Sequence, residues 1–284
     1  MIVARTRDEL NDALKGSGKV GFVPTMGALH AGHLALLETA KRETETAVCS
    51  IFVNPTQFGP NEDFSKYPRD EDRDFALAKS AGCDVMFFPG QATIYAGSHT
   101  TVRVSDVSRR YEGAVRPGHF EGVATVVHKL FGLVKPDVAY FGLKDIQQCA
   151  VVGQMVRDLF LPVDVRYVET VREASGLALS SRNAYLSQSD REKAATIYRV
   201  LCSSADEMRM NSNPSETATI LTSAKQSLVH FGFLVDYLDL VDPLTMTPLD
   251  CPKPNSRLIV AARLSRVRLL DNVALFETPF LTRA

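Results

Sequence analysis

The segment that decides the fold reads VGFV at residues 20–23 and continues as PTMGALHAGH at residues 24–33. Its first part is short, apolar and followed by a proline, which is typical of a buried strand. After the histidines, Leu34 and Leu37 begin an inward-facing apolar stripe that indicates a helix. A buried strand that leads directly into a helix is the first half of a βαβ unit.

Further apolar runs continue this alternation over the first part of the chain. They are bounded by Gly, Pro or Asn, and the runs are 47–53, 85–88, 138–141 and 163–168. Several lack strict alternation, which favours parallel strands covered on both faces. Residues 123–134 carry a helical stripe that ends at Lys135-Pro136. These patterns predict an α/β fold, a Rossmann-like doubly wound parallel sheet over residues 1–173.

A different pattern follows over residues 174–284. Residues 188–210 and 214–231 are predicted helices, and the predicted strands are 235–241, 258–264 and 267–275. Turn-rich connectors lie at residues 211–214 and 252–255. A run of helices followed by a run of strands indicates a second, smaller α+β domain.

Composition narrows the class of protein. The 284 residues carry 32 Lys+Arg and 33 Asp+Glu, a net charge of −1, which disfavours a protein that coats nucleic acid. The five cysteines are scattered without a C-x-x-C pair, as in a reduced cytoplasmic protein. No amino-terminal signal peptide and no bilayer-spanning apolar segment is apparent, so we expect a cytoplasmic protein without membrane or nucleic-acid partners.

The histidines at 30 and 33 follow the first strand at a predicted helix start. Ligands of open α/β sheets bind at the carboxyl ends of strands, where free helix N–H groups attract phosphate. His30 and His33 can both face one ligand there and donate to phosphate oxygens, while Gly32 permits close approach to the backbone. The alternative is that one histidine caps the helix and the other packs in the core. A zinc site is weaker because no third ligand has usable spacing, so no protein metal site is predicted.

Several longer segments identify a family. The H-x-G-H segment resembles the HIGH signature of nucleotidyltransferases. Segments SIFVNPTQF (50–58), RPGHF (116–120), YFGLKDIQQ (140–148) and GLALSSRN (176–183) resemble, in order, those of the pantoate–β-alanine ligase family. That resemblance implies ATP-dependent ligation of pantoate and β-alanine to pantothenate through a pantoyl adenylate, with release of AMP and pyrophosphate. It also implies Mg²⁺ and a homodimer formed through the larger domain.

The resemblance also assigns residues. The implied catalytic groups are His30, His33, Lys144 and Arg182, and Gln57 and Gln148 hold the substrates pantoate and β-alanine. The implied ATP-binding residues are Met26, Gly27, Ala28, Leu29, His30, Ala31, Gly32, His33, Gly142, Leu143, Lys144, Asp145, Val171, Leu179, Ser180, Ser181 and Arg182. Residues 180–182 look like a divergent KMSKS-type loop. Arg116 and His119 lie in a Gly- and Pro-rich segment that suggests a lid.

The segments depart from the family pattern at three positions, and the residues leave other functions open. Leu143 replaces a common Glu, Ser175 a common Asp, and Leu179 a position often held by Met or Lys. If Leu179 replaces the superfamily lysine, phosphate charge falls chiefly to Lys144 and Arg182. The alternatives are a cytidylyltransferase-like enzyme and a non-catalytic nucleotide-binding module. A nicotinamide dehydrogenase is disfavoured because no G-x-G-x-x-G follows the first strand.

Overall fold

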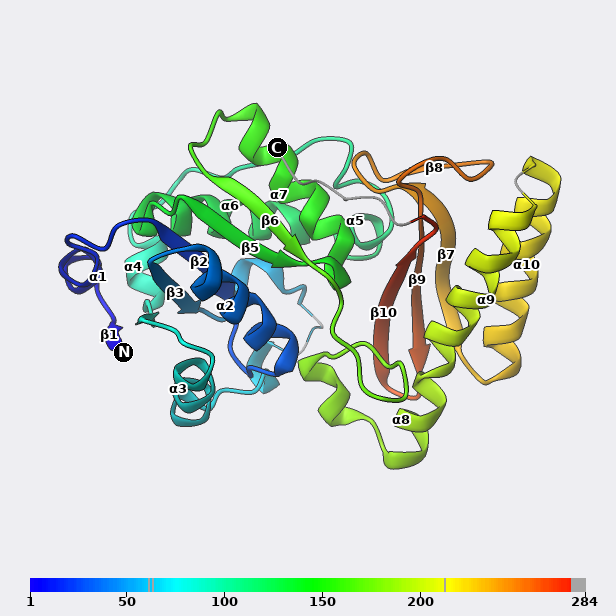
Figure 1. Cartoon of the computed structure of the whole chain (residues 1–284), viewed down its shortest axis with the longest axis horizontal. Coiled ribbons are helices and arrows are strands. Elements are labelled where there is room, and N and C mark those ends of the chain that lie inside the picture. The colour runs from blue at the N-terminus through cyan, green and yellow to red at the C-terminus, as the bar shows by residue number, and fades with distance from the viewer. Residues whose placement is uncertain (61, 63, 212, 277–284) are drawn as a thin grey trace. The chain divides into compact units, whose positions relative to one another are not determined.

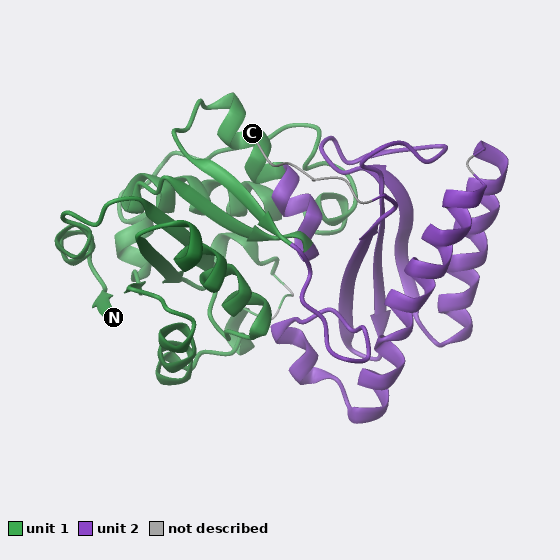
Figure 2. Ribbon diagram, in the orientation of Figure 1, with its two compact units in different colours: residues 1–143, 151–168, 281–284 green, residues 144–150, 169–280 purple. Residues whose placement is uncertain are grey.

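The computed structural model describes residues 1–60, 62, 64–211 and 213–276 (Figure 1). Its residue contacts define two units, coloured separately in Figure 2. Unit 1 comprises residues 1–143 and 151–168, and unit 2 comprises residues 144–150 and the described residues from Glu169 onward. Residues 144–150 belong to unit 2, although the chain on either side of them belongs to unit 1. No single point in the chain therefore separates the two units. The sequence-based boundary at 173/174 stays a prediction.

Unit 1 contains a six-stranded parallel sheet, which confirms the predicted fold class. The strand order is β1-β4-β3-β2-β5-β6. The strands are β1 (Ile2–Ala4), β2 (Val20–Thr25), β3 (Thr46–Ile51), β4 (Val85–Phe87), β5 (Val138–Gly142) and β6 (Asp164–Val168). All five strand pairings are parallel. The edge strand β1 was not predicted, because three residues are too short a run to show a pattern.

The winding of the sheet reverses beside β2. From β2 the chain adds β3 and β4 on one side and β5 and β6 on the other. In doubly wound sheets, ligands bind at the carboxyl ends of the strands on either side of such a reversal, which here are β2 and β5. In unit 1 this edge receives the segment after Thr25 from β2 and Gly142 from β5.

Helices cover both faces of the unit 1 sheet. Leu36, Leu37 and Ala78 of helices α2 and α3 pack with strand residues such as Val23 in one buried cluster. On the other face, Phe131 of α6 contacts Phe22 at a ring-centroid distance of 6.3 Å. The helices are α1 (Arg7–Ala13), α2 (Ala31–Glu43), α3 (Glu71–Ser80), α4 (Gln91–Tyr95), α5 (Glu112–Val115), α6 (His119–Val134) and α7 (Ile146–Asp158), which begins in unit 2. Short 3-10 turns are η1 (Pro55–Gln57), η2 (Phe64–Lys66) and η3 (Leu143–Asp145).

Unit 2 is built on an antiparallel sheet with the order β10-β9-β7-β8, as expected for the smaller α+β domain. Its strands are β7 (Leu234–Asp242), β8 (Thr247–Pro248), β9 (Arg257–Leu264) and β10 (Val267–Ala274). Its helices are α8 (Gln188–Ala194), α9 (Thr196–Met210) and α10 (Pro214–His230), with the 3-10 turn η4 (Ser181–Tyr185). One face of the sheet packs against α9 and α10 in a single apolar cluster (Figure 1).

The prediction of one helix over 188–210 was wrong, because Ala195 separates α8 from α9. Alanine favours helix, so its sequence gives no warning of the break. Ala194, Ala195 and Thr196 are all buried. The interruption is a single residue long, and Ala195 itself keeps right-handed helical angles, with φ −61° and ψ −18°.

The five cysteines, all within the described residues, are thiols that form no disulfide with one another. Cys49, Cys83 and Cys149 are buried, whereas Cys202 and Cys251 are partly exposed. Burial raises the pKa of the Cys49, Cys83 and Cys149 thiols well above their ordinary range. The raised pKa favours the protonated form of each of these three thiols at neutral pH, which is the less reactive form.

No helix in the described ranges combines the length and apolar character required to cross a bilayer.

Candidate active site

The loop between β2 and α2 is held by a buried carboxylate. Asp74 of α3 is 1% exposed, and its two oxygens accept from the backbone N–H groups of Ala28 at 2.8 Å and Leu29 at 2.7 Å. Gly27 has a φ of +82°, and a Cβ there would lie 2.9 Å from the Asp74 carboxylate. Burial raises the pKa of Asp74, although both N–H groups favour its charged form. This contact fixes the loop that precedes the two histidines.

His30 and His33 lie together at the start of α2. Their rings are stacked, with centroids 4.1 Å apart and planes inclined by 30°. His30 is the N-cap, and its Nδ1 accepts from the Gly32 N–H at 3.2 Å. The capping role considered from the sequence is thus correct for His30, and it coexists with the pairing of the two rings. Gly32 has a structural reason as well, since a Cβ there would lie 3.0 Å from the His30 ring.

The Gln57 side chain is fixed by Asn54, which sequence reasoning did not assign. Asn54 Nδ2 donates to Gln57 Oε1 and to the Gly122 carbonyl, both at 3.1 Å. Asn54 Oδ1 accepts from the Tyr95 hydroxyl at 2.7 Å, so the amide orientation is determined. Gln57 Nε2 lies 3.1 Å from Met26 Sδ, which brings two predicted site residues together.

Arg116 and His119 hold the backbone of Gln57. His119 Nδ1 donates to the Gln57 carbonyl at 2.8 Å, and Arg116 Nη1 donates to His119 Nε2 at 3.1 Å. Arg116 also forms an ion pair with Glu62 at 2.6 Å. Burial and the Arg116 charge lower the pKa of His119 to about 4, so the ring is neutral at pH 7. In unit 1, Arg116 and His119 of the RPGHF segment therefore hold the Gln57 backbone, and a lid role for this segment stays a prediction.

In unit 2, Lys144 and Asp145 lie in the turn η3, and Gln148 is the third residue of α7. Lys144 Nζ is 3.4 Å from Asp145 Oδ1, and the Lys144 side chain is 19% exposed. The Lys144 carbonyl accepts from the Asn272 side chain at 3.0 Å. The preceding residue, Leu143, belongs to unit 1 and stands where the family resemblance places a Glu. Its apolar side chain is buried.

The loop with the predicted nucleotide-binding residues 171 and 179–182 lies in unit 2, and a backbone hydrogen bond closes it. Leu179 N–H donates to the Val171 carbonyl at 3.0 Å, which brings these two predicted residues together. Ser180 Oγ accepts from the Arg182 N–H at 3.3 Å and caps η4. Gly176 has a φ of +93°, and a Cβ there would lie 2.7 Å from Tyr198. Ser175, at the position of the common Asp, accepts from the Leu177 N–H at 3.4 Å.

Arg172 anchors this loop to strand β10. Its guanidinium forms two hydrogen bonds with Asp271, at 2.6 Å and 2.8 Å, and stacks on the Tyr198 ring at 3.8 Å. It also donates to the Gly176 carbonyl at 3.1 Å. Sequence reasoning did not find Arg172 or Asp271, because the contact joins residues 99 positions apart.

The predicted site residues thus form two clusters, one in each unit. Unit 1 contains residues 26–33, Gln57 and the end of β5, and unit 2 contains Lys144, Asp145, Gln148 and the 171–182 loop. Within the described ranges, no group of three or more His, Cys, Asp or Glu is arranged to hold a metal ion.

Comparison with known families decides the identity. The model of the pantoate–β-alanine ligase family matches residues 2–274. The chain belongs to this family. The pantothenate synthetase of Acidiphilium cryptum is 50% identical over 260 residues, covering 91% of this chain and 92% of the relative. The match extends over both units.

Solved structures of family members share the fold. The pantothenate synthetase of Thermus thermophilus superimposes with a TM-score of 0.92 at 50% identity, over 97% of this chain and 100% of the other. The Francisella tularensis pantoate–β-alanine ligase, complexed with β,γ-ATP and β-alanine, gives a TM-score of 0.78 at 34% identity, over 99% and 100%. The chain is therefore an enzyme of the pantoate–β-alanine ligase family.

Proposed function

We propose that this family member joins pantoate to β-alanine in an ATP-dependent reaction through an enzyme-bound pantoyl adenylate. The products are pantothenate, AMP and pyrophosphate. The observation that carries the proposal is the stacked pair His30 and His33 at the start of α2, on the strand-end edge where the winding of the sheet reverses. The ligands named for the Francisella tularensis structure support ATP and β-alanine as substrates.

In the first step, a pantoate carboxylate oxygen forms a bond to the α-phosphorus of ATP. The bond from that phosphorus to the bridging oxygen of the β-phosphate breaks, and pyrophosphate leaves. Negative charge grows on the phosphate oxygens during this step, so hydrogen-bond donors and cations around them lower the barrier. We assign this role to His30, His33, Lys144 and Arg182. Mg²⁺ enters as the complex with ATP, as is usual for nucleotide substrates.

The capping bond determines how His30 acts. Its Nδ1 accepts from the Gly32 N–H and is therefore unprotonated. In this proposal the neutral ring carries its proton on Nε2 and donates from that nitrogen to a phosphate oxygen. The ring of His33, stacked at 4.1 Å, limits the rotation of His30. Helix capping and phosphate binding are compatible functions of the same side chain.

In the second step, the uncharged amine of β-alanine attacks the acyl carbon of the adenylate. The carbon–oxygen bond to AMP breaks, and the amine proton passes to solvent. Gln57 and Gln148 hold the pantoate hydroxyls and carboxylate, and Gln57 also lies near β-alanine. Contacts at both the side chain and the carbonyl of Gln57 preorganise it for this role.

The remaining nucleotide contacts come from residues 26–33, 142–145, 171 and 179–182. Their backbone N–H groups and hydroxyls surround the ATP phosphates and ribose in this proposal. We also propose that the protein acts in the cytoplasm as a homodimer formed through unit 1. Light scattering of the purified protein tests the dimer.

The decisive experiment is product analysis. Purified protein is incubated with ATP, Mg²⁺ and pantoate, with and without β-alanine, and the products are identified by mass spectrometry. We expect enzyme-bound pantoyl adenylate and one equivalent of pyrophosphate without β-alanine, and pantothenate with AMP when it is added. A released nucleotide-linked product without an amide would indicate a cytidylyltransferase-like enzyme instead. Nucleotide binding without any turnover would indicate a non-catalytic module.

A further inference from the structure

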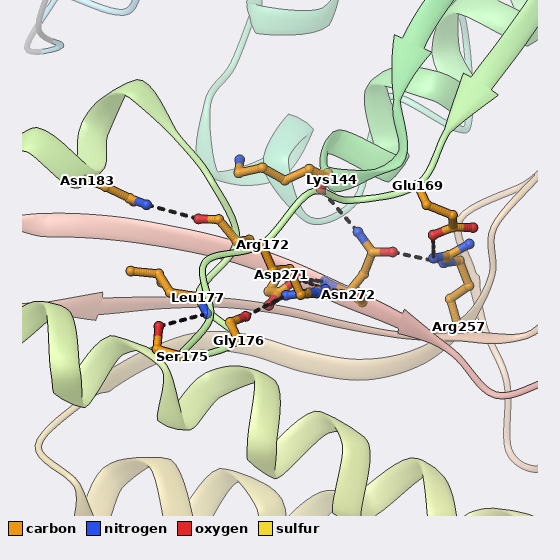
Figure 3. Close-up of polar contacts among 11 residues, drawn as sticks. Lys144, Glu169, Arg172, Ser175, Gly176, Leu177, Asn183, Arg257, Asp271 and Asn272 are labelled. Carbon is orange, nitrogen blue, oxygen red and sulfur yellow. Dashed lines mark hydrogen bonds and ion pairs between the residues drawn. The ribbon is translucent and has the colours of Figure 1, made fainter. Parts of the chain in front are cut away.

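Two neighbouring residues of the edge strand β10 contact both nucleotide-binding segments of unit 2. Asp271 and Asn272 are 5% and 1% exposed, although both side chains are polar. Consecutive strand residues point to opposite faces of a sheet. Asp271 therefore reaches the loop that contains Arg172, and Asn272 reaches Lys144 from the other face (Figure 3).

Two hydrogen bonds determine the orientation of the Asn272 side-chain amide. Its Oδ1 accepts from Arg257 Nε at 2.8 Å, and its Nδ2 donates to the Lys144 carbonyl at 3.0 Å. A guanidinium only donates and a carbonyl only accepts, so the reversed amide would lose both bonds. Arg257 is itself 3% exposed, and its Nη2 lies 3.8 Å from Glu169. This geometry is specific for asparagine, since no other side chain of this size both donates and accepts here.

The contact fixes the backbone of Lys144, while its ammonium group makes a separate contact with Asp145 Oδ1 at 3.4 Å. In Figure 3 the Lys144 carbonyl faces Asn272, whereas the side chain extends away from the strand. The flexible lysine side chain thus starts from an anchored backbone. An anchored Cα reduces the volume that the ammonium group explores, which preorganises it for a phosphate.

Asp271 anchors the second segment through Arg172. The two hydrogen bonds between them and the Arg172–Gly176 contact close the turn that leads to Ser180, Ser181 and Arg182. The Asp271 carboxylate also accepts from the Asn272 N–H at 2.8 Å, and Arg172 reaches the Asn272 carbonyl at 3.3 Å. These bonds connect the two anchors. We call Lys144, Arg172, Arg257, Asp271 and Asn272 the β10 network.

We propose that Asn272 is a positioning residue for adenylate formation, acting through Lys144, and that the Arg172–Asp271 pair positions the 180–182 loop in the same step. The inference rests on the proposed function, because it takes Lys144 and Arg182 as phosphate-binding groups. It goes beyond that function by assigning the placement of both groups to strand β10.

The test is Asn272→Asp, which keeps the size of the side chain. The new carboxylate pairs with Arg257 but places an oxygen against the Lys144 carbonyl, so η3 must shift while the fold is retained. We expect pantoate-dependent ATP–pyrophosphate exchange to slow by about 10- to 100-fold, the scale for a small misplacement of a reacting group. Reaction of supplied pantoyl adenylate with β-alanine should stay within about twofold of the parent rate, because no triphosphate is bound in that step.

Two controls separate positioning from a general loss of structure. Asn213→Asp makes the same chemical change at the cap of α10, and Ile220→Ala weakens the apolar cluster of unit 2. Both should leave the ratio of the exchange rate to the aminolysis rate unchanged.

A separate variant, Arg172→Lys, tests the second anchor. It keeps the positive charge beside Asp271 but cannot form both hydrogen bonds with the carboxylate. The fold-increase in KM for ATP should be several times larger than the fold-decrease in the aminolysis rate.

A double-mutant cycle tests whether Asn272 acts through Lys144. In a Lys144→Ala background, Asn272→Asp should slow exchange by less than about twofold, since the group it positions is gone. Parent-like exchange in folded Asn272→Asp, equal loss in both half-reactions, or full additivity with Lys144→Ala would each overturn the proposal. The proposed function fails separately: the parent protein would form no adenylate, or Lys144→Ala alone would have no effect.

Discussion

In each unit, a polar side chain donates to the backbone carbonyl of a candidate site residue. The two units differ in the chemical group that donates. In unit 1, the Gln57 carbonyl accepts from a neutral histidine, His119, backed by Arg116. In unit 2, the Lys144 carbonyl accepts from the Asn272 amide, backed by Arg257. Each time, a buried or half-buried polar side chain links a guanidinium to a backbone carbonyl. An imidazole can gain a proton as the pH falls and an amide cannot, so only the unit 1 contact is sensitive to pH.

The largest expected effect comes from a residue that we propose contacts the substrate directly and that holds no backbone carbonyl. His33→Ala should slow pantoyl adenylate formation by about 10²–10³-fold, the usual loss for one transition-state donor. Pyrophosphate release that depends on ATP and pantoate measures it. His230→Ala, an exposed histidine at the end of α10, is the matched control and should retain the parent rate. A near-parental rate in His33→Ala would contradict the assignment of this ring.

A smaller effect on activity but a large one on stability is expected at Asp74. Asp74→Ala leaves the buried N–H group of Leu29 and the partly buried N–H group of Ala28 without their acceptor, which should cost about 2–4 kcal/mol of unfolding free energy. Urea denaturation monitored by circular dichroism measures this cost. Asp72→Ala, an exposed change on the same helix, should cost less than about 1 kcal/mol. Equal costs for the two variants would show that the loop does not depend on Asp74.

The smallest expected effect is the pH dependence that distinguishes the two carbonyl contacts. The folded pKa of His119 is about 4, below the ordinary value of 6.5, so the unfolded chain takes up the proton first as pH falls. The contribution of His119 is therefore complete above pH 6.5 and is lost as the pH falls to about 4, by no more than about 3 kcal/mol.

Unfolding free energies measured between about pH 7 and pH 4 test this expectation. His119→Asn should flatten the pH dependence relative to the parent protein. Asn272→Ala should lower stability by a similar amount at each pH, because it removes an amide that does not titrate. If both variants keep the parental slope, the neutral His119 ring is not what couples unit 1 to pH.

The sequence predicted the parts of the molecule that are local in the chain. The run at residues 20–23 is apolar because β2 is buried on both faces, and the same holds for β3, β4 and β5. The H-x-G-H spacing predicted that His30 and His33 share one helix start, which the structure confirms. Short strands such as β1 and β8 were missed because two or three residues carry no periodicity.

The supporting contacts were not predictable from the sequence. Asn272 lies in an ordinary strand and meets Lys144 across 128 positions, so no spacing rule connects them. Asp74 similarly looks like one of several acidic residues in the first turn of α3, and only its burial separates it from Asp72. Such contacts depend on how distant segments pack, and sequence periodicity contains no information on that pairing.

The three buried thiols are natural probes of local unfolding. Cys49 and Cys83 lie inside unit 1, and Cys149 lies in the segment of α7 that belongs to unit 2. A thiol reagent added to the native protein modifies such a group only when its surroundings open. Modification at Cys49 and Cys83 therefore follows the opening of one unit, and modification at Cys149 the opening of the other. Mass spectrometry of the modified cysteines can therefore show whether the two units of this enzyme unfold locally one at a time or together, without any introduced label.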